Sequence, residues 1–262
     1  MKKIFILALA SLAMLSCTGG SGSKGGALSG KFSVSVGTQV QFSQGNLQYQ
    51  PSTKTWRFAQ NQFEIIGSSN VRIAEDYDGW IDLFGWGTGD NPTITITNNE
   101  LYPNYTEWGN NVISNGGKDI QWRTLTNEEW NYLFATRDEA KNKYGVGEVN
   151  GIEGLIILPD EWTLPNGLTF NHGVAKGLGS KASSINCYSL DQWNKMEKNG
   201  AVFLPEAGER KGTKMTSDCG HYWAATAYNY AQAYSIFISP IGFSGKGSNG
   251  SRYYGQSVRL VK

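Results

Sequence analysis

The sequence predicts a loop-rich α+β fold, with two main helices set among short antiparallel sheets. Three observations lead to this class: 33 Gly among 262 residues, short runs that alternate apolar and polar residues, and only two segments with complete helix signals. Nine Trp and eleven Phe supply material for a sizeable core. Residues 31–262 have the size of one large domain, and we expect a single domain there.

The N-terminal residues are typical of a secretion signal. Lys2 and Lys3 precede an apolar run, Ile4 to Leu15, which is too short to span a bilayer. We therefore expect a signal peptide at residues 1–16.

The end of this signal resembles a bacterial lipobox. Residues 14–17 read MLSC, with Met14 in the place of the usual Leu. A Gly/Ser-rich stretch follows directly, and such a composition is typical of a flexible spacer. We therefore expect acylation of Cys17, a tether at residues 17–30, and a membrane anchor that holds the protein in the cell envelope.

Alternating runs predict half-buried strands in the first part of the domain. They are Lys31 to Val36, Gln39 to Phe42 and, less regularly, Thr55 to Ile66. The Gly/Asp/Trp-rich segment Asp76 to Asn99 is predicted to be a long ordered loop that ends in a short strand, TITIT at residues 93–97.

The first helix is predicted to begin after Thr126. Thr126 and Glu129 have the spacing of a capping box, in which each side chain bonds the other residue's backbone N–H. Trp130, Leu133 and Phe134 then share one face of the helix, which should be buried.

The second helix is predicted to begin after Ser189, with Gln192 completing its cap and Trp193 and Met196 facing inward. Asn199-Gly200 is a typical helix end. Each helix precedes an apolar strand that ends in Leu-Pro: GLIILP at residues 154–159 and GAVFLP at residues 200–205.

The C-terminal segment 221–262 has the composition of a binding surface. It contains six of the thirteen Tyr, mixed with Ser, Asn, Gly and Ala, and the chain has no carboxylate side chain after Asp218. Antibody-like paratopes use this mixture, with rigid rings for contact area and small polar residues for hydrogen bonds. The alternative is a Tyr-rich hairpin packed under a loop.

Alternation within this segment predicts which side chains face outward. Tyr234, Ile236 and Ile238 would point inward, whereas Ser235, Phe237 and Ser239 would point outward. The alternative for Phe237 is cover by the loop GFSGKGSNGS, residues 242–251. The candidate ligand-binding residues are Tyr228, Asn229, Tyr230, Ser235, Phe237, Ser239, Tyr253 and Tyr254.

Two stretches resemble a known family. Residues 123–132 (RTLTNEEWNY) resemble the R-L-P-[ST]-x-x-E-W-E-[YF] signature of the formylglycine-generating, sulfatase-modifying type of C-type-lectin fold, although Thr124 and Leu125 replace its Leu-Pro. Residues 222–226 (YWAAT) and 252–261 (RYYGQSVRLV) resemble the Y-W-S-S-T and R-x-x-G-x-S-V-R ending of a group of Bacteroidetes lipoproteins. Several members of that group are variable proteins of diversity-generating retroelements.

The resemblance implies a C-type-lectin-like fold with a fixed scaffold and a sequence-diversified C-terminal surface. The capped helix and the strand at residues 257–261 would be scaffold, with Val258 and Leu260 on one face, and Trp223 would anchor the segment in the core. The function implied is that of a lipid-anchored ligand-binding protein. The alternatives are a cell-envelope enzyme of the formylglycine-generating type and a structural envelope component without a diversified site.

Retroelement diversification would leave a pattern in the codons. Adenine-directed mutation of AAC or AAT codons keeps a pyrimidine in the third position, so varied codons cannot encode Lys, Met, Gln, Glu or Trp. Trp223, Gln232, Lys246 and Gln256 would therefore be fixed positions, whereas all eight candidate ligand-binding residues are permitted outcomes.

The sequence does not supply the residues of the enzyme alternative. The copper-bound Cys pair of related oxidases lies within a few residues, whereas Cys187 and Cys219 are far apart. His172 and His221 are the only histidines, and neither shows metal-ligand spacing. We therefore expect no enzyme, no catalytic residue, no cofactor and no metal. Cys187 and Cys219 could form one disulfide or remain two buried thiols.

The net charge and the expected lipid anchor limit the classes of partner that the protein can have. The net charge of +1 gives no electrostatic reason to expect nucleic acid. The expected partners are an unknown protein or glycan ligand and, through the lipid anchor, a membrane; the protein itself is expected to be a monomer. We expect the outer membrane. Its exterior and its periplasmic face both remain as alternatives, because Thr18 to Ser23 lack the acidic residues that resemble a surface-export signal.

Overall fold

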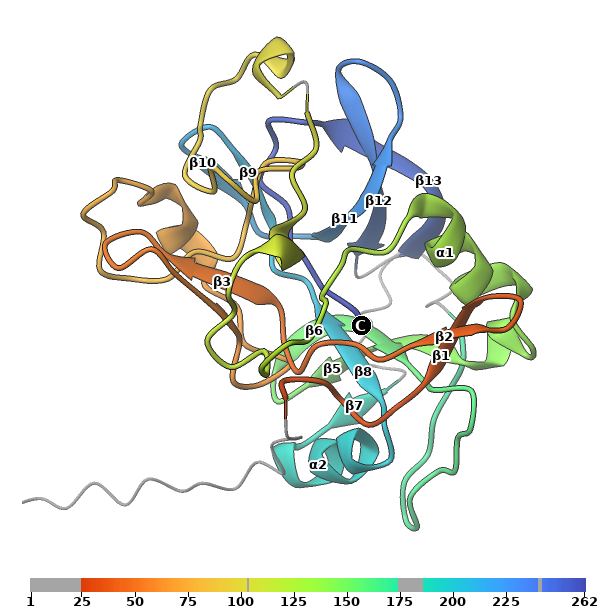
Figure 1. Cartoon of the computed structure of the whole chain (residues 1–262). Helices are drawn as coiled ribbons and strands as arrows, with labels where there is room; N and C mark the ends of the chain where they lie inside the picture. The colour runs from red at the N-terminus through yellow and green to blue at the C-terminus, as the bar shows by residue number, and fades with distance from the viewer. Residues whose placement is uncertain (1–24, 103, 174–185, 240–241) are drawn as a thin grey trace, which may run out of the picture.

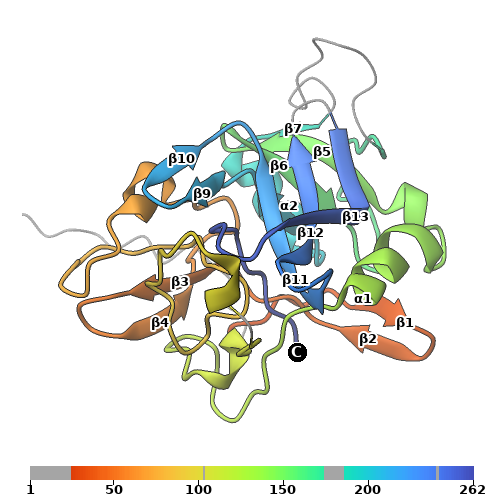
Figure 2. The same cartoon turned by 90° about the horizontal axis from the view of Figure 1, so that it is seen from above.

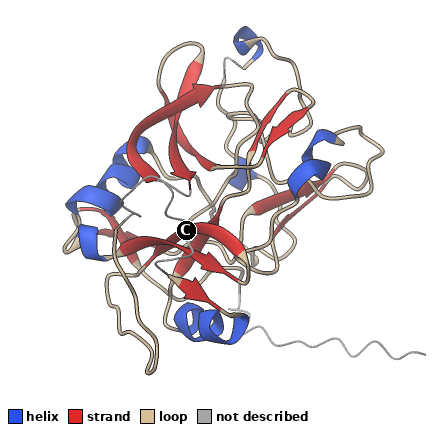
Figure 3. Cartoon of the chain, turned by 180° about the vertical axis from the view of Figure 1, so that it is seen from behind, coloured by secondary structure: helices blue, strands red, loops and turns tan. Residues whose placement is uncertain are grey.

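The computed structural model describes residues 25–102, 104–173, 186–239 and 242–262. Within these ranges the chain forms two α-helices and several small antiparallel sheets, joined by long ordered loops (Figures 1 and 3). This is the loop-rich α+β class that the sequence predicts. Cys17 and the proposed signal lie outside the described residues.

The largest sheet has four strands in the order β7-β5-β6-β8. β5 (Tyr144–Val149) and β6 (Ile152–Ile157) form a hairpin, β8 (Val202–Pro205) pairs antiparallel with β6, and the short β7 (Cys187–Tyr188) runs parallel to β5. The two apolar segments that end in Leu-Pro are therefore direct neighbours in one sheet.

A second sheet contains the C-terminal segment, in the order β11-β12-β13. β11 (Gly220–Ala227) pairs with β12 (Gln232–Ser239), which pairs with β13 (Gly242–Ser251). The expectation of a loop at residues 242–251 was wrong. Those residues instead pair with β12 on both sides of an irregularity in the register: Ser248 lies opposite Ser235, and Ser244 lies opposite Phe237.

Shorter elements surround these two sheets (Figure 2). Three hairpins contribute strand pairs: β1 (Phe32–Ser35) with β2 (Thr38–Val40), β3 (Leu47–Gln50) with β4 (Thr55–Phe58), and β9 (Glu209–Lys211) with β10 (Lys214–Thr216). Four single 3-10 turns lie in the connections: η1 (Gly67–Val71), η2 (Asn99–Leu101), η3 (Trp108–Asn110) and η5 (Ala140–Asn142).

Both predicted helices are present with their predicted caps. α1 (Asn127–Asn131) begins with a complete Thr126–Glu129 capping box and continues into a π-type turn, η4 (Tyr132–Thr136). α2 (Leu190–Lys198) begins with a complete Ser189–Gln192 box and buries Trp193 and Met196. None of the helices in the described ranges is long and apolar enough to cross a membrane.

We expect Thr126→Ala to lower the free energy of unfolding by ~1 kcal/mol, the usual effect of losing a capping hydroxyl. The Thr126 hydroxyl accepts the N–H of Glu129 at 3.2 Å, and Arg123 holds the Glu129 carboxylate with two hydrogen bonds of 2.6 and 2.7 Å. Urea unfolding measures the change, with Thr163→Ala at an exposed position as the control. Equal stabilities of the two variants would contradict the role of the cap.

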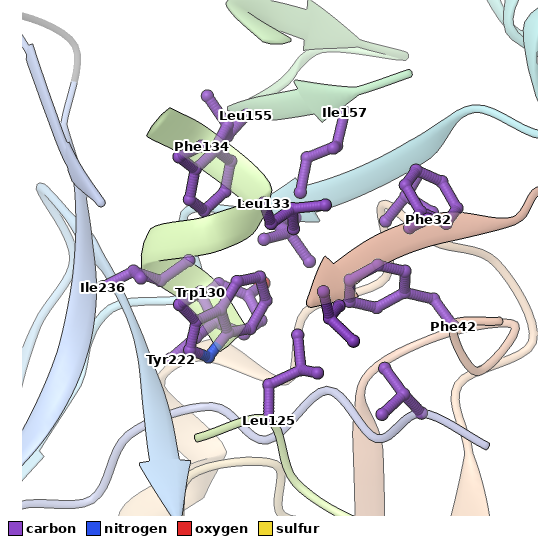
Figure 4. Close-up of a cluster of buried hydrophobic side chains, with 14 of the residues drawn as sticks. Phe32, Phe42, Leu125, Trp130, Leu133, Phe134, Leu155, Ile157, Tyr222 and Ile236 are labelled. Carbon is purple, nitrogen blue, oxygen red and sulfur yellow. The ribbon is translucent and has the colours of Figure 1, made fainter. Parts of the chain in front are cut away.

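The central core lies where α1 and η4 meet β1, β2 and both larger sheets. Trp130, Leu133 and Phe134 are all buried there, as predicted, and Trp130 stacks on Phe134 with ring centroids 5.7 Å apart (Figure 4). Tyr222 and Ile236 reach the same cluster from the β11-β12-β13 sheet (Figure 4). Helix and sheet are thus fixed to each other by one apolar cluster.

Two further clusters complete the interior. An aromatic core gathers residues of β3, β4 and the central loops, and includes Trp86, Trp108, Trp122 and Trp223. The other cluster lies between α2 and the outer face of β6 and β8. Because Tyr222 of β11 faces the central core and Trp223 faces the aromatic core, the middle of β11 is buried on both faces of the sheet.

Three sequence-based expectations need correction. The described end of the expected tether is packed: Ala27 and Leu28 are buried, and the Leu28 N–H donates to the Phe42 carbonyl at 2.8 Å. Residues 93–97 form no strand, because no neighbouring strand lies alongside them. Residues 257–261 make only isolated bridges and are buried throughout, since the core surrounds them.

Candidate functional site

The turn between β11 and β12 carries the most exposed aromatic side chains of the C-terminal segment. Tyr230 is 81% exposed and Tyr228 is 50% exposed. The Tyr228 ring packs edge-on against Tyr234, with centroids 5.2 Å apart. The ring of Tyr234 therefore covers part of Tyr228, whereas Tyr230 projects into solvent.

The Asn229 side chain closes this turn instead of facing a ligand. Its Oδ1 accepts the N–H groups of Ala231 and Gln232, both at 2.8 Å, and its Nδ2 donates to the Gln232 side chain at 3.1 Å. Asn commonly makes such side-chain turns. Of the three candidate residues here, Asn229 thus shapes the turn, and the two Tyr rings remain available for contact.

Arg252 fixes the turn to the body of the protein. Its side chain is 6% exposed and lies over the Trp86 ring at 4.4 Å. Nη2 donates to the Asn229 carbonyl at 2.6 Å, and Nη1 donates to the Tyr102 carbonyl at 2.9 Å. Hydrogen bonds from a charged guanidinium are among the stronger ones in proteins. The exposed rings therefore lie on a turn that Arg252 holds in place by a hydrogen bond to its backbone.

A second group of candidate residues is half-buried and lies around β9. Its members are Tyr253, Tyr254 and Phe237. Tyr253 and Tyr254 pack edge-on with centroids 4.8 Å apart, and the Lys211 ammonium lies over Tyr254 at 4.5 Å. Lys211 Nζ is 3.1 Å from Glu209 Oε2. Glu209 also approaches the His221 ring, which packs against Phe237 with centroids 4.9 Å apart.

The expectation that Ser235 and Ser239 point outward was wrong, because both are buried. Ser235 pairs with Trp223 in the β11-β12 ladder and so lies on the side of the aromatic core. The alternation in the sequence is real, but at Ser235 the face opposite the central core is covered by the aromatic core, so both sets of side chains are buried there. Phe237 lies on the same face as Ser235 and is half-buried, with its ring against His221.

The groups near His221 are poorly suited to nucleophilic chemistry. Burial is the main cause that lowers the pKa of His221, while Glu209 opposes the shift. Burial, with help from Glu209, Glu206 and Asp218, raises the pKa of the Cys219 thiol to about 11. A thiol with so high a pKa carries little thiolate, the reactive form, at neutral pH.

Neither described cysteine is bridged: Cys187 is exposed and Cys219 is half-buried, and both are free thiols. Across residues 25–102, 104–173, 186–239 and 242–262, no three His, Cys, Asp or Glu side chains converge in a way that could hold a metal ion.

Glu206 makes the stability depend on pH. Burial, with the carboxylates of Glu153 and Asp218, raises the pKa of Glu206 from 4.5 to about 8, and Oε1 is buried without a hydrogen-bond partner. The folded state therefore binds a proton that the unfolded state releases between about pH 4.5 and 8, so stability falls as pH rises through this window.

We expect Glu206→Gln to remove this dependence, since an amide does not ionise. Unfolding free energies of both proteins, measured from pH 5 to pH 9, should diverge in favour of the variant as pH rises. A constant difference across that range would mean that Glu206 does not retain its proton in the folded protein.

Sequence reasoning missed the partners of the exposed turn. Arg252 belongs to the C-terminal motif, but the motif does not indicate that its guanidinium joins two loops. Tyr102, which accepts one of its hydrogen bonds, lies 150 positions earlier in the chain.

Comparison of the chain with protein-family models, with curated proteins and with solved structures finds no match. The function is therefore inferred from the geometry of the site.

Proposed function

We propose that the protein is a lipid-anchored ligand-binding protein of the cell envelope, built on a C-type-lectin-like scaffold. Its recognition surface would be centred on the turn that carries Tyr228 and Tyr230. The single observation that carries this proposal is that two exposed aromatic rings lie on a turn whose backbone is held in place by hydrogen bonds. Asn229 closes the turn and Arg252 clamps it from beneath.

The physical reason is preorganisation. A Tyr ring offers a large amphipathic contact area and loses little conformational entropy when it binds. A turn that is already held also spares the entropy of ordering a loop on association. Exposed aromatic residues on a flexible loop would lack this advantage.

Photo-cross-linking tests the proposal. p-Benzoylphenylalanine at position 230 should yield a discrete adduct when the protein is displayed in its native envelope and exposed to its surroundings. The control is the same amino acid at position 112, where Val112 is 90% exposed on another loop. No adduct at position 230, or the same adducts at both positions, would contradict a specific surface at the turn.

Acylation of Cys17 is a separate part of the proposal. A fatty-acid analogue supplied during growth should label the wild-type protein and not Cys17→Ala, and the wild type should sediment with membranes. Equal labelling of the two proteins would remove the lipid anchor from the account.

Two observations support diversification of the surface. The C-terminal motif resembles that of retroelement variable proteins, and all eight candidate residues can arise by adenine-directed mutation of AAC or AAT codons. The neighbouring DNA tests it: a reverse-transcriptase gene and a near-copy of the final coding stretch should lie close by. Differences between the two copies should fall at the Tyr228 and Tyr230 codons and spare Trp223 and Gln256. A neighbourhood without either element would leave a binding surface of fixed sequence.

A further inference from the structure

The chain contains five Asn-Gly pairs, and the structure restrains them to different degrees. In such a pair the Gly nitrogen can attack the side-chain amide of the Asn, because Gly has no side chain that hinders the approach. The reaction needs a free Asn side chain and a backbone that can rotate between the two residues. The pairs begin at Asn115, Asn150, Asn166, Asn199 and Asn249.

The pair at Asn115 is held at both reacting groups. The Asn115 side chain accepts the Phe58 N–H at 2.8 Å and donates to the Phe58 carbonyl at 2.9 Å. The attacking nitrogen, that of Gly116, donates to the Ile113 carbonyl at 2.9 Å. Reaction at this pair would require the loss of all three hydrogen bonds.

The pair at Asn199 is held in the same way at the end of α2. Asn199 Nδ2 donates to the Thr163 carbonyl at 2.8 Å, and the Gly200 N–H donates to the Glu197 carbonyl at 2.8 Å. Gly200 is also buried. Neither the side chain nor the nitrogen is therefore free to approach the other.

Two further pairs are fixed by strand pairing. Asn150 and Gly151 are the two turn residues of the β5–β6 hairpin, and the Asn150 N–H donates to the Tyr188 carbonyl at 3.0 Å. Asn249 and Gly250 lie inside β13 and pair with β12. Rotation of the backbone at either pair would disrupt a ladder of hydrogen bonds.

The pair at Asn166 lacks these restraints. It lies in the loop after β6, the green loop that projects from the lower edge of the molecule (Figures 1 and 3), and both of its residues are exposed. Among the described residues, neither the Asn166 side chain nor the Gly167 N–H has a hydrogen-bond partner. A single hydrogen bond of 3.1 Å, from the Leu168 N–H to the Pro165 carbonyl, closes the turn, and a Cβ at Gly167 would meet no atom within 4 Å.

We propose that Asn166 is a site of spontaneous modification, in which the Gly167 nitrogen attacks Asn166 Cγ. The N–Cγ bond forms, the Cγ–Nδ2 bond breaks, and the amide nitrogen leaves as ammonia with the proton that Gly167 gives up. Water then opens the cyclic imide at either carbonyl, which leaves Asp or isoaspartate at position 166. The reaction needs no enzyme, oxidant or cofactor, it adds a negative charge to the loop, and it is independent of the proposed ligand binding.

Peptide mapping by mass spectrometry tests the proposal on the full-length folded protein, stored at neutral and at mildly alkaline pH. Peptides with Asp or isoaspartate should appear at position 166 before they appear at the other four pairs. Their formation should be faster at the higher pH, because the attack requires loss of the Gly167 amide proton. Conversion at any other pair that is as fast as at Asn166, or an Asn166 that stays intact, would overturn the proposal.

The same measurement in urea separates the effect of the fold from that of the sequence. Unfolding removes the restraints on the other four pairs, so their rates should approach that of Asn166. An unchanged lead of Asn166 in urea would show that its neighbours in sequence, and not the fold, select it.

Asn166→Gln is the matched variant, because it keeps a side-chain amide but would have to form a larger and less favourable ring. The acidic form of the stored protein, separated by ion-exchange chromatography, should be lost in this variant, while the folded protein keeps its stability. An acidic form that accumulates equally in both proteins would assign the new charge to another residue and overturn the proposal.

Discussion

Replacing Trp223 by Ala is expected to lower the free energy of unfolding by about 3–5 kcal/mol, the usual range for a fully buried Trp. The ring is 1% exposed within the aromatic core, and its Nε1 donates to the Phe84 carbonyl at 2.7 Å. The variant leaves a cavity and removes one of two hydrogen bonds to the Phe84 carbonyl, which still accepts the Gln256 N–H at 3.0 Å; the cavity therefore accounts for most of the loss.

Trp223→Phe separates the two effects. Most of the ring volume stays and the donor is lost, so the decrease should be clearly smaller than for Ala. Urea unfolding followed by circular dichroism measures both variants. A loss below about 1 kcal/mol for Trp223→Ala would mean that the site collapses around the cavity and that Trp223 is not an anchor of the sheet.

The double replacement Tyr228→Ala, Tyr230→Ala is expected to abolish binding while leaving the fold intact. Aromatic anchors commonly contribute at least ~2 kcal/mol each to an interface, so affinity for the partner identified through position 230 should fall about a thousandfold when the two contributions add. Both rings are largely outside the core, so unfolding stability should change by less than about 1 kcal/mol. Isothermal titration and urea unfolding on the same preparation provide the two values.

Phe237 stays unchanged in that variant because its ring packs on His221, and its removal would disturb the sheet. Val36→Ala, at an exposed position on the β1–β2 turn, is the control for loss of apolar surface elsewhere. If the double variant unfolds, the two rings belong to the core. If it binds with unchanged affinity, the surface lies elsewhere.

The parts of the fold that could be predicted are those with strong local signals. The capping boxes at Thr126 and Ser189 depend on contacts three residues apart, so their spacing in the sequence was sufficient. The apolar face of Trp130, Leu133 and Phe134 follows from helix geometry alone. The C-type-lectin-like scaffold rests on the motif resemblance at residues 123–132, 222–226 and 252–261, and we propose it on that basis.

The predictions that were wrong share one physical cause. They depend on which distant segments pack against a strand, and a local sequence pattern does not contain that information. Alternation identified the two faces of β12 correctly, but it could not show that a second core lies over Ser235. The same limit applies to residues 242–251, whose composition favours a loop although β12 pairs with them. The Arg252 clamp likewise depends on Tyr102, which is distant in the sequence.

A structure of the protein bound to the partner that cross-links through position 230 is the most direct test of the recognition surface. We predict that the interface buries Tyr230 and Tyr228, leaves Val112 and Val36 in solvent, and keeps the hydrogen bond from Arg252 to the Asn229 carbonyl. A partner seated on another face, with Tyr230 still exposed to solvent, would contradict the account.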